Sequence, residues 1–185
     1  MKTIETDMPR VNSLETQLQK TIRDIPDFPK PGIVFKDITP VLQDGKIFGS
    51  VIDAFADILK GQAITHVVGI EARGFVFGSA LAYKLGAWLI PARKKGKLPH
   101  RTIAESYKLE YGEATLEIHA DALRKNDCVV LVDDLLATGG TAAATAKLVE
   151  RTGAKIQTML FVVELKFLHG RDILKNWDIR SLVSF

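Results

Sequence analysis

The sequence has little cysteine. Its 185 residues include a single one, Cys128, so no disulfide can form within the chain. Cys128 lies inside an apolar run, which indicates a buried structural thiol. Because thiols stay reduced in the cytosol, we expect a cytoplasmic protein.

The sequence also lacks long apolar runs and a strong charge of either sign. No apolar run approaches the ~20 residues that a membrane-spanning helix needs, and charges break up the first twenty residues too often for a secretory signal. The net charge of +3 is too small to indicate nucleic-acid binding by itself. We therefore expect neither a membrane nor a nucleic-acid partner, and an anionic small substrate would explain the charge equally well.

Composition places the chain among ordinary globular proteins. Hydrophobic residues make up 46% of it and charged residues 25%. We find no internal repeat, and the length favours one domain over residues 1–185.

Short apolar runs alternate with helical patterns along most of the sequence. The patterns predict helices over 11–22, 46–60, 73–85 and 140–151, and strands over 65–70, 87–90, 127–132 and 155–163. Near-continuous apolar strands that alternate with helices predict an α/β fold, with a central, mostly parallel sheet flanked by helices on both faces.

Two segments interrupt this rhythm. Residues 25–32 hold three prolines and a glycine, so we expect an extended or turning loop. Residues 92–120 begin with basic residues and continue as two alternating runs, 106–111 and 114–119, which predict a β-hairpin. A long excursion of this kind is usually functional or disordered, and we interpret it as a lid.

The strongest chemical signal is the segment VVLVDDLLATGGT, residues 129–141. A buried strand precedes two acids, Asp133 and Asp134, and a small-residue loop leads into a helix. Glycines and the helix start present N–H groups to a phosphate, and carboxylates accept hydrogen bonds from a vicinal diol or hold a metal. The segment predicts a ribose 5-phosphate site. The alternative is a simple glycine turn with solvated acids; a Walker loop is excluded by its spacing.

At this point a family becomes recognisable. The segment VVLVDDLLATGGT resembles the ribose-phosphate motif of the type I phosphoribosyltransferases, and DDLLATGGT is similar to the adenine-specific branch. The resemblance extends over nearly the whole chain through DFPKPGIVFKDITPVL, EARGFVFG, RKKGKLP and SYKLEYG. It implies the type I phosphoribosyltransferase fold, with an N-terminal hood over about residues 1–40 and a flexible lid hairpin over 92–120.

The resemblance also implies a reaction. Adenine would react with 5-phosphoribosyl 1-pyrophosphate, in the presence of Mg²⁺, to give AMP and pyrophosphate in purine salvage. It further implies a homodimer. We expect no direct protein ligand for the Mg²⁺ ion.

The family's roles transfer to specific positions. The ribose-phosphate residues would be Asp133, Asp134, Ala137, Thr138, Gly139, Gly140 and Thr141. The pyrophosphate residues would be Glu71, Ala72, Arg73, Arg93 and Lys97. Arg73 also fits on physical grounds, because a guanidinium grips phosphate oxygens bidentately. The alternatives are a surface ion pair for Arg73 and, for residues 93–97, a solvated charge run or a nucleic-acid patch, which usually has aromatic or further basic neighbours that this segment lacks.

Adenine would contact Val34, Phe35, Lys36 and Leu136, and many family members carry arginine where this chain has Lys36. The lid would contribute Tyr111 and Glu110, and Glu110 would handle a proton on the purine. The catalytic residues would be Glu110 and Arg73. The alternatives are core packing for Phe35 and an exposed hairpin glutamate for Glu110.

Three other functions compete with this interpretation. One is a phosphoribosyltransferase for hypoxanthine, xanthine or orotate, against which the hood segment argues. The others are a regulator that senses phosphoribosyl pyrophosphate and a nucleotide-binding domain without turnover. The regulator usually adds a DNA-binding domain, for which 185 residues leave no room.

Overall fold

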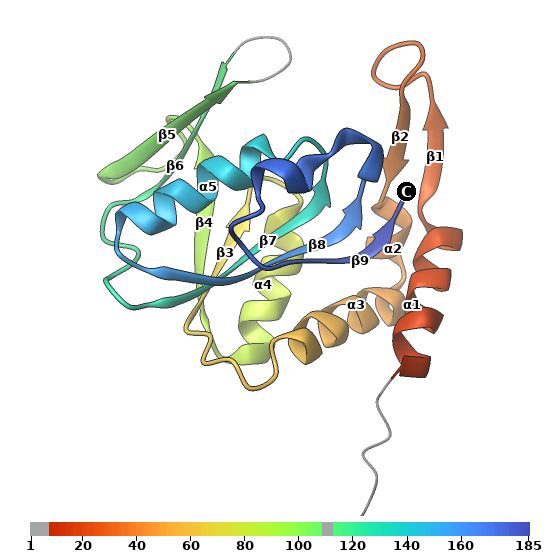
Figure 1. Ribbon diagram of the computed structural model, residues 1–185, viewed down its shortest axis with the longest axis horizontal. Helices are drawn as coiled ribbons and strands as arrows, with labels where there is room; N and C mark the ends of the chain where they lie inside the picture. Colours follow the sequence, from red (N-terminus) through yellow and green to blue (C-terminus); the bar gives the residue numbers. More distant parts are fainter. Residues whose placement is uncertain (1–7, 109–112) are drawn as a thin grey trace, which may run out of the picture. The chain divides into compact units, whose positions relative to one another are not determined.

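A computed structural model describes the backbone of residues 8–108 and 113–185 (Figure 1). The chain divides into two compact units, Met1–Ala54 and Phe55–Phe185. No helix among these described residues is both long and apolar enough to cross a membrane.

The first unit combines helices with a two-stranded sheet. It contains α1 (Met8–Thr21), β1 (Arg23–Pro26), β2 (Val34–Asp37), α2 (Thr39–Gln43) and the greater part of α3 (Gly45–Ile58). The helical spacing found in the sequence is explained by burial, since Leu14, Leu18 and Ile22 are all less than 9% exposed. The proline-rich segment does form a loop, but β1 and β2 flank it as an antiparallel pair that the sequence did not predict.

The second unit is built on a seven-stranded sheet. Its strands lie in the order β5-β6-β4-β3-β7-β8-β9. Their bounds are β3 His66–Ile70, β4 Trp88–Lys94, β5 Thr102–Lys108, β6 Glu113–His119, β7 Cys128–Leu136, β8 Lys155–Glu164 and β9 Ile179–Ser184. Five neighbouring strands, β4, β3, β7, β8 and β9, are parallel to one another. The strand β6 pairs antiparallel with both β4 and β5.

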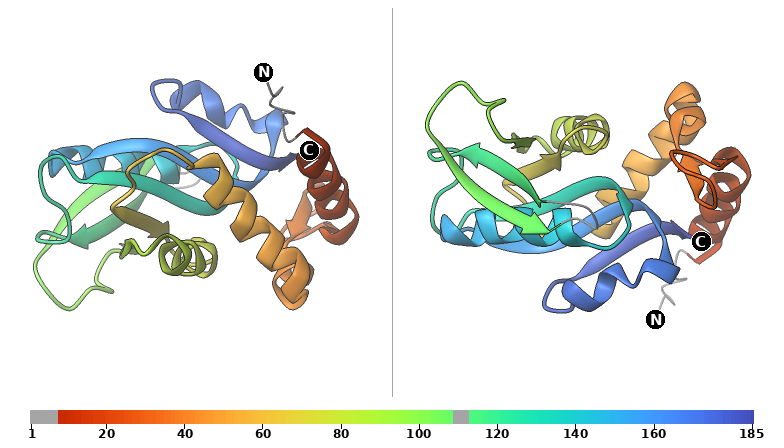
Figure 2. Two further views of the ribbon diagram at one scale, coloured as in Figure 1. Left: turned by 90° about the horizontal axis from the view of Figure 1, so that it is seen from below. Right: turned by 90° about the horizontal axis from the view of Figure 1, so that it is seen from above.

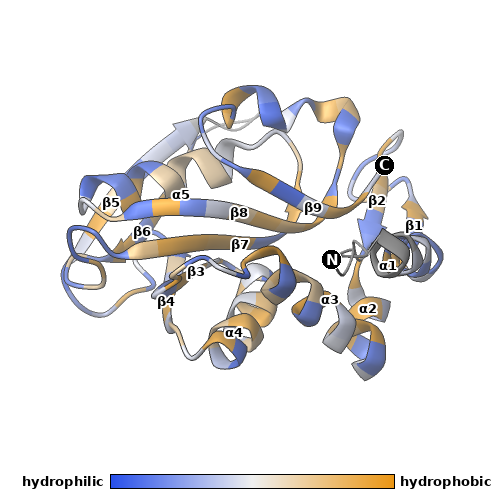
Figure 3. Cartoon of the chain, turned by 60° about the horizontal axis from the view of Figure 1, so that its bottom comes forward, coloured by the Kyte–Doolittle hydropathy of each residue, from blue (hydrophilic) through white to orange (hydrophobic). Residues whose placement is uncertain are grey.

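Two helices cover opposite faces of this sheet. Figure 2 shows α4 (Gly74–Leu85) on one face and α5 (Gly140–Arg151) on the other. Because both faces are covered, β3 is buried at every position and β8 from Thr158 onward. Figure 3 shows the resulting apolar stretches along β7 and β8. Two short 3₁₀ helices, η1 (Lys166–Leu168) and η2 (Gly170–Ile173), precede β9.

The strand β7 is longer than its sequence pattern predicted. It continues through both acids to Leu136, whereas the pattern predicted an end at Val132. The extension forms because Leu135 and Leu136 stay in register with Val163 and Glu164 of β8. The two acids therefore lie within the strand rather than after it.

The predicted hairpin is present as β5 and β6, which pair from Thr102 opposite His119 to Lys108 opposite Glu113. Side chains tie β5 to α5. The Arg151 guanidinium donates a hydrogen bond of 2.7 Å to the Ala104 carbonyl, and Glu105 forms an ion pair with Lys147. The strands of the hairpin thus extend the main sheet.

Candidate active site at the carboxyl edge of the sheet

Two loops leave the carboxyl ends of neighbouring central strands. β3 and β7 are adjacent and parallel, with Gly69 opposite Val132. One loop runs from Glu71 to Arg73 and leads into α4; the other runs from Ala137 to Gly139 and leads into α5. In open α/β sheets this carboxyl edge is where ligands bind.

The loop after β7 forms a small hollow at the start of α5. Gly139 adopts a left-handed conformation, φ 82°, at the N-cap of this helix. The hollow has a volume of about 70 Å³ and is lined by Asp133, Leu135, Leu136, Ala137, Thr138, Gly139, Gly140, Thr141, Ala142 and Phe161. The unpaired N–H groups and the positive dipole end of a helix start favour an anion there. None of these lining residues is a cation, so backbone groups and hydroxyls would carry the binding.

The two acids of β7 have different surroundings. Asp133 lines the hollow, and its Oδ1 accepts a hydrogen bond of 2.8 Å from the Asp134 backbone N–H. Asp133 keeps some exposed surface, but burial of its carboxyl, followed by the neighbouring charge of Asp134, raises its pKa well above the ordinary value. Asp134 is 5% exposed, and its Oδ2 lies 2.5 Å from Nε of Arg73. This Oδ2 atom accepts no hydrogen bond from the described residues, so the contact is an ion pair.

Gly74 brings the loop after β3 close to β7. A Cβ atom at this position would lie 2.7 Å from the Val132 carbonyl oxygen and 2.9 Å from Oδ1 of Asp133. Only glycine permits this approach, which sets the start of α4 against the acidic end of β7. The preceding residue, Arg73, is thereby placed next to Asp134.

Glu71 binds basic residues at the end of β4 and just after it. Its carboxylate accepts hydrogen bonds from Nζ of Lys97 at 2.8 Å, the backbone N–H of Lys94 at 2.9 Å and Nε of Arg93 at 3.3 Å. Burial by itself would raise the pKa of Glu71, but these hydrogen bonds outweigh it and hold the pKa at about 2. The structure therefore brings Glu71, Arg93 and Lys97 together, with Ala72 next in the same loop.

Comparisons with known proteins point to one family. A family model described as a phosphoribosyl transferase domain matches residues 39–178. The adenine phosphoribosyltransferase of Carboxydothermus hydrogenoformans is 55% identical over 91% of this chain and 99% of its own length. The chain belongs to the adenine phosphoribosyltransferase family. It is accordingly an enzyme of the pentosyltransferase class.

Solved adenine phosphoribosyltransferases share the fold. The crystal structure from Thermoanaerobacter pseudethanolicus is 52% identical and superposes with a TM-score of 0.89, covering 92% of this chain and 99% of that one. The Saccharomyces cerevisiae enzyme, complexed with an imino-altritol bisphosphate and adenine, is 39% identical with a TM-score of 0.88 and covers 92% and 99%. The predicted type I phosphoribosyltransferase fold is confirmed.

Of the other family positions, Leu136 lines the hollow, three lie in the first unit and two fall outside the described residues. In the first unit, the Phe35 ring packs edge-on against Phe28 at 5.2 Å, Val34 is half-exposed, and Nζ of Lys36 lies 2.6 Å from Asp24. In the second unit Leu136 is 1% exposed. Glu110 and Tyr111 fall outside the described residues.

Two residues that contact the loop after β7 were missed in the sequence. Tyr107 on β5 reaches residues Ala137–Thr141, here called the phosphate loop after the ligand expected from the sequence, because Thr141 Oγ1 donates a hydrogen bond of 3.2 Å to its hydroxyl. The alternation of the hairpin placed Tyr107 in a strand but gave no sign of its partner. Gly170 approaches the loop from η2, and a Cβ atom there would lie within 2.2 Å of the Ala137 carbonyl oxygen. No motif marks Gly170.

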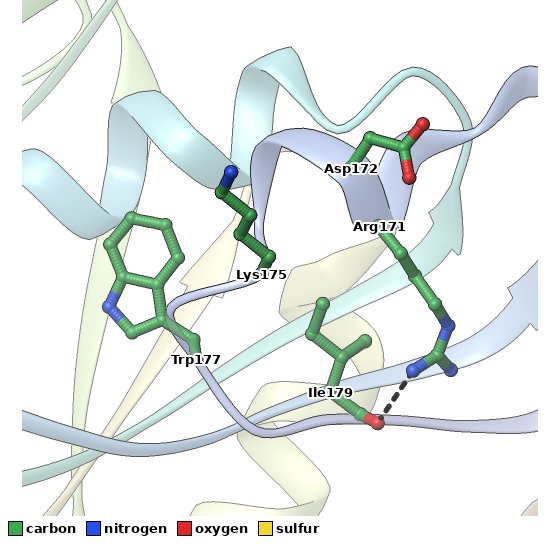
Figure 4. Close-up of a pocket in the computed structure, with 5 residues that line it drawn as sticks. All are labelled: Arg171, Asp172, Lys175, Trp177 and Ile179. Atoms are coloured by element: carbon green, nitrogen blue, oxygen red, sulfur yellow. Dashed lines mark hydrogen bonds between the residues drawn. The ribbon is translucent and has the colours of Figure 1, made fainter.

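A larger hollow, of about 500 Å³, is lined by Arg171, Asp172, Lys175, Trp177 and Ile179 (Figure 4). Its lining does not include the phosphate loop or the acids. The Arg171 guanidinium donates a hydrogen bond to the Ile179 carbonyl and pairs with Glu164, so this cation is engaged within the protein. The smaller hollow, at the carboxyl ends of the strands, is therefore the one that contains Asp133 and the glycines singled out in the sequence.

Proposed function

We propose that the chain transfers the ribose 5-phosphate of 5-phosphoribosyl 1-pyrophosphate to adenine, and so makes AMP and pyrophosphate for purine salvage. The observation that carries this proposal is the pairing of two loops at adjacent strand ends. One offers a backbone cradle beside a carboxylate, and the other offers Arg73, Arg93 and Lys97. A phosphorylated sugar with an anionic leaving group requires this combination.

The cradle formed by Ala137–Thr141 is assigned to the 5-phosphate, and Asp133 and Asp134 to the ribose hydroxyls. Asp133 lines the hollow and therefore has direct access to a sugar there. Asp134 would accept a hydrogen bond from a ribose hydroxyl while its ion pair keeps Arg73 in place. Carboxylate acceptors suit a vicinal diol because each of its hydroxyls can donate a hydrogen bond.

The leaving pyrophosphate is assigned to Arg73, Arg93 and Lys97, with Ala72 in the adjoining loop. As the bond from C1 to the pyrophosphate oxygen breaks, positive charge develops on the sugar and negative charge on the leaving group. Cations held ready beside the leaving group lower that barrier. Glu71 supports this role by holding Arg93 and Lys97, because a carboxylate itself would repel the phosphates.

Mg²⁺ fits the site as an ion that arrives with the substrate. Residues 8–108 and 113–185 contain no group of three or more His, Cys, Asp or Glu side chains that could form a dedicated cage. Mg²⁺ usually keeps several waters and binds through substrate phosphates, so the substrate would supply its main ligands. When bound, the ion would neutralise charge on the pyrophosphate.

We assign the adenine subsite to Val34, Phe35 and Lys36 of a hood over about residues 1–40, together with Leu136. The support is the resemblance of the hood segment and the adenine present in the yeast relative's complex. Main-chain groups beside Phe35 suit adenine, whose amino donor and ring-nitrogen acceptor match one C=O and one N–H. The domain assignment that goes with this is one phosphoribosyltransferase domain over residues 1–185.

The hairpin over 92–120 is proposed as the flexible lid, with Tyr111 and Glu110 as its functional residues. Adenine loses a proton as its ring nitrogen bonds to C1, and Glu110 would accept it. Glu110→Gln should lower kcat by about 10²–10⁴-fold while the affinity for phosphoribosyl pyrophosphate is kept. Glu113→Gln, on an exposed residue of β6, is the matched control and should leave kcat unchanged. Near-normal single turnover in Glu110→Gln would contradict the assignment.

A homodimer and a cytoplasmic location complete the proposal. Large apolar side chains are exposed on α4 and β4, among them Tyr83 at 91% and Trp88 at 72%, and burial against a second copy would cover them. Trp88→Lys should therefore shift the species seen by light scattering from dimer to monomer, and an unchanged mass would contradict this surface. The single free cysteine, Cys128, suits a reducing cytoplasm.

The direct test is an assay with 5-phosphoribosyl 1-pyrophosphate, Mg²⁺ and a panel of bases. Adenine should be converted to AMP, with hypoxanthine, xanthine, guanine and orotate converted far more slowly. Preference for another base would show a different branch of the family, and binding without product would show a sensor.

A further inference from the structure

The phosphate loop packs against a turn that lies about 30 positions further along the chain. This turn, His169–Ile173, contains η2. A Cβ atom at Gly139 would lie 2.6 Å from the Gly170 carbonyl oxygen and 3.0 Å from Cγ1 of Ile173. The two backbones are therefore in direct contact, and movement of the turn would change the position of the loop.

An ionic network between Arg171 and the buried Glu164 fixes this turn. Arg171 binds Glu164 through two hydrogen bonds, Nε to Oε1 at 2.6 Å and Nη2 to Oε2 at 2.7 Å. Its Nη1 donates to the Ile179 carbonyl of β9 at 3.1 Å, as Figure 4 shows. Ser181 Oγ donates to Glu164 Oε2 at 2.6 Å. The network thus joins the turn to the last residue of β8 and to β9.

Glu164 is also linked to the phosphate loop. It lies opposite Leu136, the residue that precedes the loop, in the pairing of β7 with β8. The next residue, Leu165, donates its N–H to the Leu136 carbonyl at 2.9 Å. Glu164 is 4% exposed, and its hydrogen bonds with Arg171 keep the pKa of the carboxyl below its ordinary value. A bidentate pair of this kind imposes direction as well as attraction.

We propose that Arg171 and Glu164 are positioning residues for the 5-phosphate subsite, acting through the His169–Ile173 turn. This inference rests on the phosphate site of the proposed function. A phosphate that is bound mainly by backbone N–H groups needs the loop in one conformation. The turn restricts the loop through its contact at Gly139. Neither Arg171 nor Glu164 lines the phosphate hollow, so their effect reaches the ligand through backbone contact.

The test compares binding of two anions by titration calorimetry to the full chain and to variants. Arg171→Met should weaken ribose 5-phosphate about tenfold, below the ~100-fold that a displacement of 1 Å can cost, and leave pyrophosphate affinity unchanged. Arg171→Lys keeps the positive charge but loses the two-pronged guanidinium contact with Glu164. Its affinity for ribose 5-phosphate should lie between those of the unmodified chain and Arg171→Met. The control is Arg180→Met, because Arg180 pairs only locally with Asp178 on the exposed side of β9 and should change neither affinity.

The outcomes separate the inference from the proposed function. Failure of the unmodified chain to bind ribose 5-phosphate would overturn the phosphate site and the inference together. Binding that Arg171→Met leaves unchanged, or equal loss of both anions, would overturn the inference but not the site.

Hydrogen exchange on the unmodified chain gives a test that does not depend on a variant's folding. Ribose 5-phosphate should increase protection over 137–141 and over 169–173 together. Protection of the loop without the turn would overturn the inference.

Discussion

The loop after β7 and the loop after β3 leave neighbouring parallel strands at one edge of the sheet, and each leads into a helix. Their construction differs. The loop after β7 depends on close backbone contact at Gly139 and Gly170 and has no cation in its hollow. The loop after β3 depends on ion pairs, with Arg73 held by Asp134, and Arg93 and Lys97 held by Glu71.

The difference indicates two ways of preparing a site for an anion. Backbone donors fixed by steric contact are ready before the ligand arrives, which suits the proposed 5-phosphate, a group that stays on the sugar. Cations held by carboxylates stay ordered without a ligand and can exchange one anion for another, which suits a group that leaves. Steric contact is insensitive to salt and pH, whereas ion pairs respond to both.

The largest expected effect breaks the backbone contact. Gly139→Val places a branched side chain at φ 82° and against the Gly170 carbonyl. We expect the free energy of unfolding to fall by at least ~3 kcal/mol, measured by denaturant titration, and ribose 5-phosphate binding to be lost. Gly61→Val is the matched control, because Gly61 has φ 80° but nothing within 4 Å of its Cβ position. Equal costs at both sites would contradict the steric account.

The next effect separates sugar from base. Asp133→Asn combined with Asp134→Asn should raise KM for phosphoribosyl pyrophosphate by at least about tenfold, since hydrogen bonds to charged groups contribute about 1.5–3 kcal/mol. KM for adenine should change much less. Steady-state kinetics with each substrate varied in turn measures this, after circular dichroism has checked the fold. An equal rise in both KM values would contradict the assignment of the acids to the diol.

A smaller effect tests the ion pairs through pH. The pKa of Glu71 is lowered from 4.5 to about 2 in the folded chain, so its contribution is complete above pH 4.5 and is lost as the pH falls toward 2. Glu71→Gln should cost about 2 kcal/mol of unfolding free energy at pH 7. The difference from the unmodified chain should shrink across that acid range. A difference that does not vary with pH would show that the charge of Glu71 is not what holds the basic residues.

The smallest effect has the opposite sign. The pKa of Asp133 is raised, so its ionised form destabilises the fold above the folded pKa, and the penalty disappears below the ordinary value of 3.8. Asp133→Asn should therefore stabilise the chain at pH 7 by about 1 kcal/mol, because the amide oxygen can still accept from the Asp134 N–H. Thermal unfolding at several pH values measures this gain. Destabilisation at pH 7 would contradict the raised pKa.

The sequence predicted the phosphate loop better than its surroundings. The order of strand, acids, glycines and helix in residues 129–141 was enough to place the loop after β7 and at the start of α5. The extension of β7 to Leu136 depends on pairing with β8, which lies about 30 residues away and leaves no local pattern. The strands β1, β2 and β9 were missed because they are short, four, four and six residues long, and carry little alternating pattern.

The partners of the charged residues were also beyond the sequence. The resemblance grouped Glu71 with Arg93 and Lys97, but it did not show that one carboxylate accepts hydrogen bonds from both. The contact between Gly139 and Gly170 joins segments without a shared motif. Such contacts are properties of the packed chain, so they appear only when the fold is known.

The most direct test of the two-loop account is the salt dependence of two affinities in the unmodified chain. Ribose 5-phosphate and pyrophosphate are titrated separately and then together, at increasing concentrations of sodium chloride. The account predicts that both bind at once and that salt weakens pyrophosphate much more steeply, because side-chain cations hold it. Competition between the two ligands, or equal salt dependence, would contradict the account.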